Sequence, residues 1–174
     1  MRILVTAALT ALIPSLAAAQ SFEGPSVGVQ LSYGAVDTSD AAELEGDNAL
    51  IGARAYFDTD VGGFLLGGGV QYDITEIDLE GVTDIDAVFR IGARGGLQNG
   101  GNYLYGTGGF AQAYLSEEAV GDSGGFFVGA GYESFVTDTI TAGVEVLYHR
   151  FQDFELDDLT ANVVTVGAHL NYRF

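Results

Sequence analysis

The sequence predicts an all-β protein: an eight-stranded antiparallel up-and-down transmembrane β-barrel, preceded by a cleavable signal peptide. Three observations predict it. Apolar and polar residues alternate with a period of two along eight segments, which indicates strands with one apolar face. Short and long connections alternate between these segments. No stretch after the N-terminal one approaches 18 uninterrupted apolar residues, so no transmembrane helix is expected in the mature chain.

The first 19 residues are expected to be an export signal. A positive charge follows the first residue, an apolar run comes next, and Ala17 and Ala19 provide an A-x-A cleavage site before Gln20. A membrane anchor is the alternative, but the run is short for a bilayer span and ends in small residues. We therefore predict two parts, a signal peptide over 1–19 and the β-barrel over 20–174.

The composition excludes several classes of function. The chain has 6 Lys and Arg against 24 Asp and Glu, a formal net charge of −18, whereas a nucleic-acid binder needs a basic face. It has no cysteine, which excludes disulfides, Cys-ligated zinc, iron–sulfur clusters and a thiol nucleophile. Hydrophobic residues make up 48% of the chain, so it is not a disordered acidic tail.

Eight strands are expected in the alternating segments. They cover residues 27–33, 51–57, 64–73, 85–94, 103–115, 126–133, 140–149 and 164–174. The fifth segment has Gly and Tyr on both faces, and we place Tyr103, Tyr105, Ala111 and Ala113 on its apolar side. Short turns are expected at 58–62, 97–102 and 135–138, and longer acidic connections at 36–48, 74–84, 116–124 and 150–160. The two ends of the barrel therefore differ, as they do in outer-membrane barrels.

The apolar face is expected to point outward, against lipid. A soluble barrel of the lipocalin type is the alternative, with an apolar interior and a polar exterior. Arg54, Arg90, Arg94 and Arg173 lie within strands on the polar face, beside small Gly, Ser and Thr residues. A Gly-rich polar face suits the narrow interior of an eight-stranded barrel. Aromatic residues at both ends of the apolar face, Tyr103 among them, match the girdles at membrane interfaces.

A charged network is expected inside the barrel, because buried charges need partners. We expect Arg54, Arg90 and Glu145 near mid-barrel, Arg94, Glu133 and Arg173 near the periplasmic mouth, and Asp73, Asp86 and His149 near the outer mouth. One interpretation of this network is a polar plug that holds the barrel shut. The other is a narrow or gated path for solutes, although side chains can largely fill so small an interior.

The outer mouth raises a hypothesis of cation binding. Asp73 and Asp86 flank the second long connection, and like charges opposite one another in a hairpin are destabilising. A divalent cation held with Glu76 or Asp84 would relieve this repulsion, since carboxylate oxygens suit calcium. Solvated carboxylates without a cation are the alternative, and no EF-hand spacing supports the cation. No cofactor and no other metal site are expected.

No enzymatic activity is predicted. Barrels of this size that act on lipids need a His beside a Ser near the outer leaflet, and the chain has only His149 and His169. Glu145 and His149 share a face four residues apart, but no serine accompanies them, and neither histidine occurs as His-x-Ser. The Gly-rich runs 67–69 and 106–109 lie inside expected strands with no helix after them, so they are not phosphate-binding loops.

The last strand carries the most specific motif, Thr165-x-Gly167-x-x-Leu170-x-Tyr172-x-Phe174. It resembles the C-terminal signal of outer-membrane barrels, which the barrel-assembly machinery reads. With the strand count and the alternating connections, it makes the chain resemble the small outer-membrane β-barrel family, of the OmpX, Ail and OmpA-membrane-domain type. The resemblance covers essentially all of the mature chain.

The resemblance implies an integral outer-membrane protein of a Gram-negative bacterium, surrounded by outer-membrane lipid and lipopolysaccharide. It implies periplasmic chaperones in transit and the barrel-assembly machinery as further partners. The implied role is structural, in envelope integrity, or a surface-interaction (adhesin-like) role for the long acidic loops. A narrow porin-like channel for small solutes or ions is the alternative. We expect no domain after the barrel, so the resemblance does not imply the wall-binding role of full-length OmpA.

Overall fold

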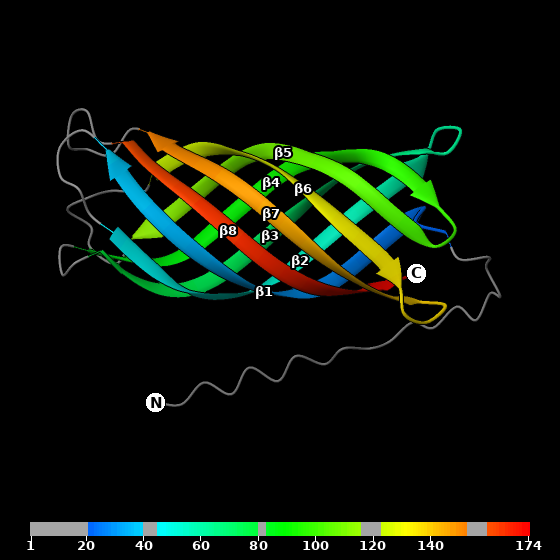
Figure 1. The fold of residues 1–174 in the computed structure, drawn as a ribbon, viewed down its shortest axis with the longest axis horizontal. Coiled ribbons are helices and arrows are strands. Elements are labelled where there is room, and N and C mark those ends of the chain that lie inside the picture. The colour runs from blue at the N-terminus through cyan, green and yellow to red at the C-terminus, as the bar shows by residue number, and fades with distance from the viewer. Residues whose placement is uncertain (1–20, 40–44, 80–82, 116–122, 153–159) are drawn as a thin grey trace.

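Eight antiparallel strands form a closed barrel in the computed structural model (Figure 1). The structure describes residues 21–39, 45–79, 83–115, 123–152 and 160–174. The strands are β1 (Gly24–Ser39), β2 (Glu45–Asp60), β3 (Phe64–Leu79), β4 (Thr83–Asn99), β5 (Asn102–Leu115), β6 (Ser123–Phe135), β7 (Ile140–Gln152) and β8 (Thr160–Arg173). Each strand pairs with its neighbours in the sequence, and β1 pairs with β8 to close the ring. The predicted eight-stranded up-and-down barrel is confirmed.

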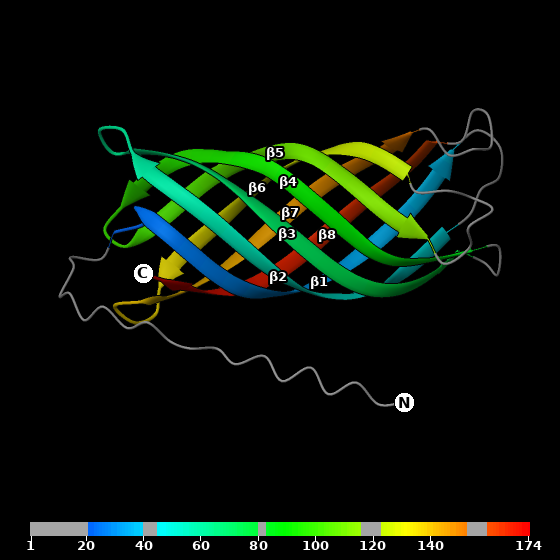
Figure 2. The same ribbon diagram turned by 180° about the vertical axis from the view of Figure 1, so that it is seen from behind.

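The two ends of the barrel are distinct (Figures 1 and 2). One end, which we call the turn end, carries the short turns 61–63, 100–101 and 136–139. The last residues of β1, β3, β5 and β7 lie at the opposite end, which we call the loop end. Gly100 and Gly101 both have positive φ, 56° and 82°, as a tight two-residue hairpin turn requires. Glycine adopts this conformation without steric cost, so the chain can reverse within two residues.

The strands are longer than the alternating segments predicted. They contain from 13 residues in β6 to 17 in β4, because backbone pairing continues where the apolar alternation has already ended. The predicted turn 58–62 starts too early, since Asp58 is still paired within β2. The predicted signal peptide, with Ala17, Ala19 and Gln20 at its cleavage site, lies outside the described residues.

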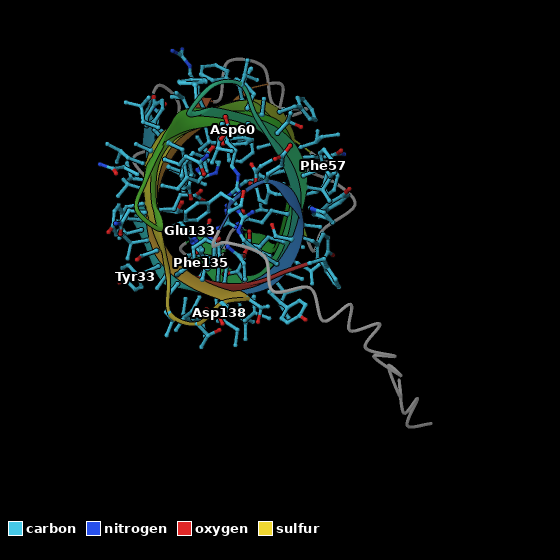
Figure 3. The ribbon with its side chains drawn as sticks, turned by 90° about the vertical axis from the view of Figure 1, so that its right-hand side faces the viewer. Tyr33, Phe57, Asp60, Glu133, Phe135 and Asp138 are labelled. Atoms are coloured by element: carbon cyan, nitrogen blue, oxygen red, sulfur yellow. The ribbon has the colours of Figure 1, made fainter. Side chains whose placement is uncertain are left out.

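Apolar side chains cover the outer wall, and polar side chains fill the interior. Val29 and Leu31 are 60% and 61% exposed, whereas Gln30 between them is 3% exposed. Figure 3, a view from the turn end, shows Phe57 outside the ring of strands and Glu133 within it. This arrangement confirms the outward apolar face and rules out the lipocalin-type alternative. No helix among the described residues is long and apolar enough to cross a membrane.

The predicted faces of β5 are wrong. Tyr103, Tyr105, Ala111 and Ala113 are at most 2% exposed and point inward, whereas Leu104 is 62% exposed on the outer wall. Tyrosine is amphipathic and can lie on either face, and the Tyr105 hydroxyl donates to Glu145 inside the barrel, so alternation did not distinguish the two faces here. Tyr103 therefore does not belong to the aromatic girdle. The other girdle residues are exposed on the outer wall: Phe57, Phe64, Tyr132 and Phe174 toward the turn end, and Tyr33, Tyr72, Phe126 and Tyr148 toward the loop end.

We expect the purified, detergent-folded protein to migrate differently on a denaturing gel before and after boiling. A closed ring has no free strand edge at which detergent can begin to separate the strands. The measurement is the mobility of unboiled and boiled samples, with far-UV circular dichroism to link the shift to loss of β-structure. Identical mobility with retained β-structure in the unboiled sample would contradict the closed barrel.

Candidate functional site

The candidate functional site is the barrel interior, where eight charged side chains are buried among the described residues. They are Arg54, Asp58, Asp73, Arg90, Arg94, Glu133, Glu145 and Arg173. Four arginines thus oppose four carboxylates, so these buried charges sum to zero although the whole chain carries −18. The excess negative charge of the chain therefore lies outside this set.

The largest group of charges, which we call the turn-end cluster, joins Arg94, Asp58, Glu133 and Arg173. Arg94 donates two hydrogen bonds to Asp58, from Nε to Oδ1 at 2.8 Å and from Nη2 to Oδ2 at 2.6 Å. Arg173 Nη2 donates to the same Asp58 Oδ2 at 3.0 Å. Glu133 lies 3.3 Å from Arg94 Nη1 and 3.4 Å from Arg173 Nε. Each carboxylate therefore contacts both guanidinium groups, in a buried, charge-balanced cluster.

Other interior side chains complete the turn-end cluster. The Arg94 guanidinium lies 4.1 Å from the centroid of the Tyr56 ring, within cation–π distance. Thr141 Oγ1 donates to Glu133 Oε1 at 2.5 Å, and His169 Nε2 lies 3.7 Å from Glu133 Oε2. With Thr141 on β7, the cluster now joins β2, β4, β6, β7 and β8, so it ties opposite walls of the barrel together.

A second pair, Arg54 and Glu145, lies beside this cluster, further toward the loop end. Arg54 Nη2 is 3.5 Å from Glu145 Oε2, and the Tyr105 hydroxyl donates to the same oxygen at 2.9 Å. Arg54 Nη1 donates to Gln30 Oε1 at 2.8 Å. The inward direction of Tyr105 is thus explained by the carboxylate that it meets inside the barrel.

A third group contains Arg90, Asp73 and His149, nearer the loop end. Arg90 Nη1 pairs with Asp73 Oδ2, and Arg90 Nε donates to His149 Nε2 at 2.7 Å. Because His149 Nε2 accepts this bond, the neutral ring carries its hydrogen on Nδ1, which faces Val163 O at 3.4 Å. The His149 ring also lies parallel to that of Phe151, with an interplanar angle of 1°.

The structure buries most of the predicted charges inside the barrel, but it groups them differently from the prediction. Arg90 bonds to Asp73 and His149, instead of joining Arg54 and Glu145 at mid-barrel. This happens because its long side chain reaches toward the loop end. The sequence prediction leaves Asp58 out of the network, because it places this residue in the turn 58–62. Alternation puts Asp58 on the same face as Arg54. The prediction also leaves His169 out of the network, although the polar face of β8 includes it.

The structure does not place the two acidic residues of the cation hypothesis opposite each other. Asp73 lies opposite Val88, and the register of β3 and β4 shifts between Ile74 and Ile77. The countercharge of Asp73 is Arg90. The side chains of Asp86, Glu76 and Asp84 lie outside the described part of the structure. Within the described part, no group of three or more His, Cys, Asp or Glu side chains could hold a metal ion.

The two histidines have packing and ion-network partners. His149 is held by Arg90 and two aromatic rings, and His169 lies beside Glu133. Among the described residues, neither ring is hydrogen-bonded to a serine. The described interior therefore contains no assembled His–Ser pair.

Apolar side chains close the interior on both sides of the charged groups. The cluster toward the loop end consists of Val88, Ala111, Ala113, Phe127, Leu147, Phe151 and Val163. The apolar cluster at the turn end, which we call the Phe22 cluster, consists of Phe22, Leu65, Tyr103 and Tyr105, with Phe135 packed against it. A cavity of about 20 Å³ lies between Arg90, His149 and the apolar cluster toward the loop end, and it has room for a single water molecule. Charged pairs and apolar side chains thus occupy the described interior from the turn end toward the loop end.

The C-terminal motif follows the alternation of β8. Leu170 and Phe174 are exposed on the outer wall, and Gly167 faces the interior, close to Ser32. Tyr172 packs edge-on against Phe174, with ring centroids 5.0 Å apart. Recognition of this motif by the assembly machinery stays a prediction.

We expect Asp58→Asn to destabilise the barrel by about 3 kcal/mol, because removing one partner leaves buried guanidinium charge uncompensated. The measurement is the free energy of unfolding in detergent or lipid vesicles, from urea titrations. Asp138→Asn is the matched control, since Asp138 is exposed in a turn at the same end of the barrel. Equal stability of the two variants would show that the turn-end cluster contributes little.

Comparisons with known proteins agree with this architecture. A family model described as "Outer membrane protein beta-barrel domain" matches residues 4–174. Neisserial surface protein A has a similar structure, with 15% identity, 87% of this chain and 100% of that chain covered, and a TM-score of 0.56. OprG from Pseudomonas aeruginosa is 12% identical, with 89% of this chain and 98% of that chain covered and a TM-score of 0.56. Ail of Yersinia pestis, in complex with the heparin analogue sucrose octasulfate, is 14% identical, with 86% of this chain and 99% of that chain covered and a TM-score of 0.50. At these identities the likeness establishes the fold alone. No curated protein matches the sequence.

Proposed function

The chain belongs to the outer membrane protein beta-barrel domain family, and on that premise we propose that it is a closed structural barrel that supports outer-membrane integrity. One observation carries this proposal: the described interior is filled by charge-balanced ion pairs between two apolar clusters. A barrel whose interior is occupied in this way serves as a stable membrane element. The surfaces that remain available for interactions are then its outer wall and its loop end.

The energetics of the turn-end cluster argue against solute passage. An ion crossing this level would have to displace the paired bonds between Arg94 and Asp58 and separate Arg173 from Glu133. Each uncompensated buried charge costs several kcal/mol, so such a path has a high barrier. The two apolar clusters add layers in which a hydrated ion loses its water without gaining polar partners.

A surface-interaction role for the loop end is the second candidate, and the distribution of charge favours it. The buried charges balance, so the net charge of −18 lies outside them, and the sequence places many carboxylates in the long connections. Such a surface favours cationic partners, or lipopolysaccharide phosphates bridged by divalent cations. An anionic ligand such as the sulfated sugar bound to Ail is disfavoured here by like-charge repulsion.

We expect the folded protein to give no discrete conductance steps in a planar lipid bilayer, because ion pairs and apolar clusters fill the described interior. Conductance is measured in symmetric salt, with a wide-pore porin as the control for insertion and detection. Discrete, ion-selective steps from the heat-modifiable form would support the narrow channel and contradict the closed structural barrel.

We also expect cells that lack the protein to become more sensitive to detergents and bulky antibiotics, and the wild-type chain to restore resistance. A variant with residues 40–44 and 116–122 shortened, outside the described structure, leaves the strand pairing of the barrel in place. If envelope integrity depends on the barrel, this variant restores resistance as well as the wild type does. Restoration by the wild type alone would instead assign the role to the loop surface.

A further inference from the structure

A short segment before β1 folds back into the turn end of the barrel. Phe22, which belongs to no strand, is only 1% exposed. Gly24 has a φ of 104°, a conformation that glycine adopts without steric cost, so the chain can bend between this segment and β1. The Glu23 amide donates to Ser21 Oγ at 3.1 Å, a local bond that shapes the bend. The segment 21–23 therefore forms a hook with Phe22 at its tip.

The Phe22 ring is packed on several sides. Its centroid lies 4.7 Å from that of Phe135 and 5.3 Å from that of Tyr103, and it belongs to one buried cluster with Leu65. The Arg173 guanidinium lies 4.8 Å from its centroid, and Arg173 Nη1 donates to the Phe22 carbonyl. Arg173 therefore links the hook to the charged residues behind it.

We propose that Phe22 is a removable stopper, which closes the turn-end mouth and controls access from the periplasm to the turn-end cluster. This inference rests on the proposed closed barrel. The pairing of β1 begins at Gly24 with β2 and at Ser26 with β8, so the hook takes no part in the strand ladder. It can therefore leave the mouth without breaking the hydrogen bonds that close the ring.

The consequence of release follows from the contacts of Arg173. This side chain meets the Phe22 carbonyl and ring on one side, and Asp58 and Glu133 on the other. When Phe22 leaves, the Arg173 guanidinium and the two carboxylates face the mouth of the barrel. The stopper thus separates a dry, charge-paired state of the turn end from one in which water or a small periplasmic solute reaches the cluster.

Fluorescence tests the position of the stopper without removing the ring. The chain has no tryptophan, so Phe22→Trp introduces a single indole, and Phe57→Trp is a matched control because Phe57 lies on the outer wall near the same end. In vesicles we expect neither acrylamide nor brominated lipid to quench Phe22→Trp, whereas brominated lipid quenches Phe57→Trp. Quenching of Phe22→Trp by acrylamide would place it in water, and quenching by brominated lipid would place it in the bilayer. Either result overturns the stopper.

Thiol labelling tests whether the stopper controls access. The chain has no cysteine, so Leu65→Cys is a single reporter within the Phe22 cluster. We expect a water-soluble methanethiosulfonate reagent to label it about tenfold faster when Phe22→Ala is added, because labelling follows the population of the open form. Phe127→Ala is the control, since Phe127 is also a buried phenylalanine but belongs to the cluster toward the loop end. Equal acceleration by both substitutions would overturn the proposal.

The failures of this proposal and of the closed barrel can be distinguished. Conductance of the wild type with a protected Phe22→Trp indole would contradict the closed barrel and leave the hook in place. A silent wild type with a quenched indole would contradict only the stopper. If Phe22→Ala loses the heat-dependent gel shift, the indole measurement decides, because Phe22→Trp keeps an aromatic ring in the cluster.

Discussion

A closed ring of eight strands encloses too little space for a hydrated lumen, so each charge inside it has to find its countercharge on another strand of the barrel. The bidentate contact of Arg94 with Asp58 meets this requirement most completely, and Arg173 shares the same carboxylate. Four buried arginines against four buried carboxylates extend this balance through the described interior. Apart from the pair of Arg90 with Asp73 on neighbouring strands, these ion pairs join strands that are not hydrogen-bonded to each other, so they hold the walls at a fixed separation.

The same narrowness explains the composition of the inner face. A Cβ atom at Gly131 would overlap the Tyr105 ring, and one at Gly143 would overlap the imidazole of His169. A Cβ at Gly67 would likewise collide with the carboxylate of Asp58. These glycines leave room for the large polar side chains of neighbouring strands. Much of the glycine on the inner face thus reflects crowding inside the barrel, and not flexibility of the chain.

Alternation predicted the barrel and the faces of most strands, because lipid outside and a polar interior impose a strict period of two. It failed on β5, where Tyr105 faces inward to reach Glu145. The ion pairs themselves could not be predicted, since the partner of Arg90 depends on strand register and on the reach of a long side chain. Phe22 was missed because it precedes every alternating segment, and only the closed mouth gives its ring a place to pack.

The balance of charge inside the barrel separates two requirements that a single chain must meet. Stability in the membrane depends on paired charges and apolar clusters between the strands, while the surplus of negative charge lies elsewhere. Because charges in water interact weakly with those inside, the acidic connections can change in length and sequence without disturbing the interior pairs. The interior therefore constrains the fold, and the loop end is the part of this protein most free to specialise.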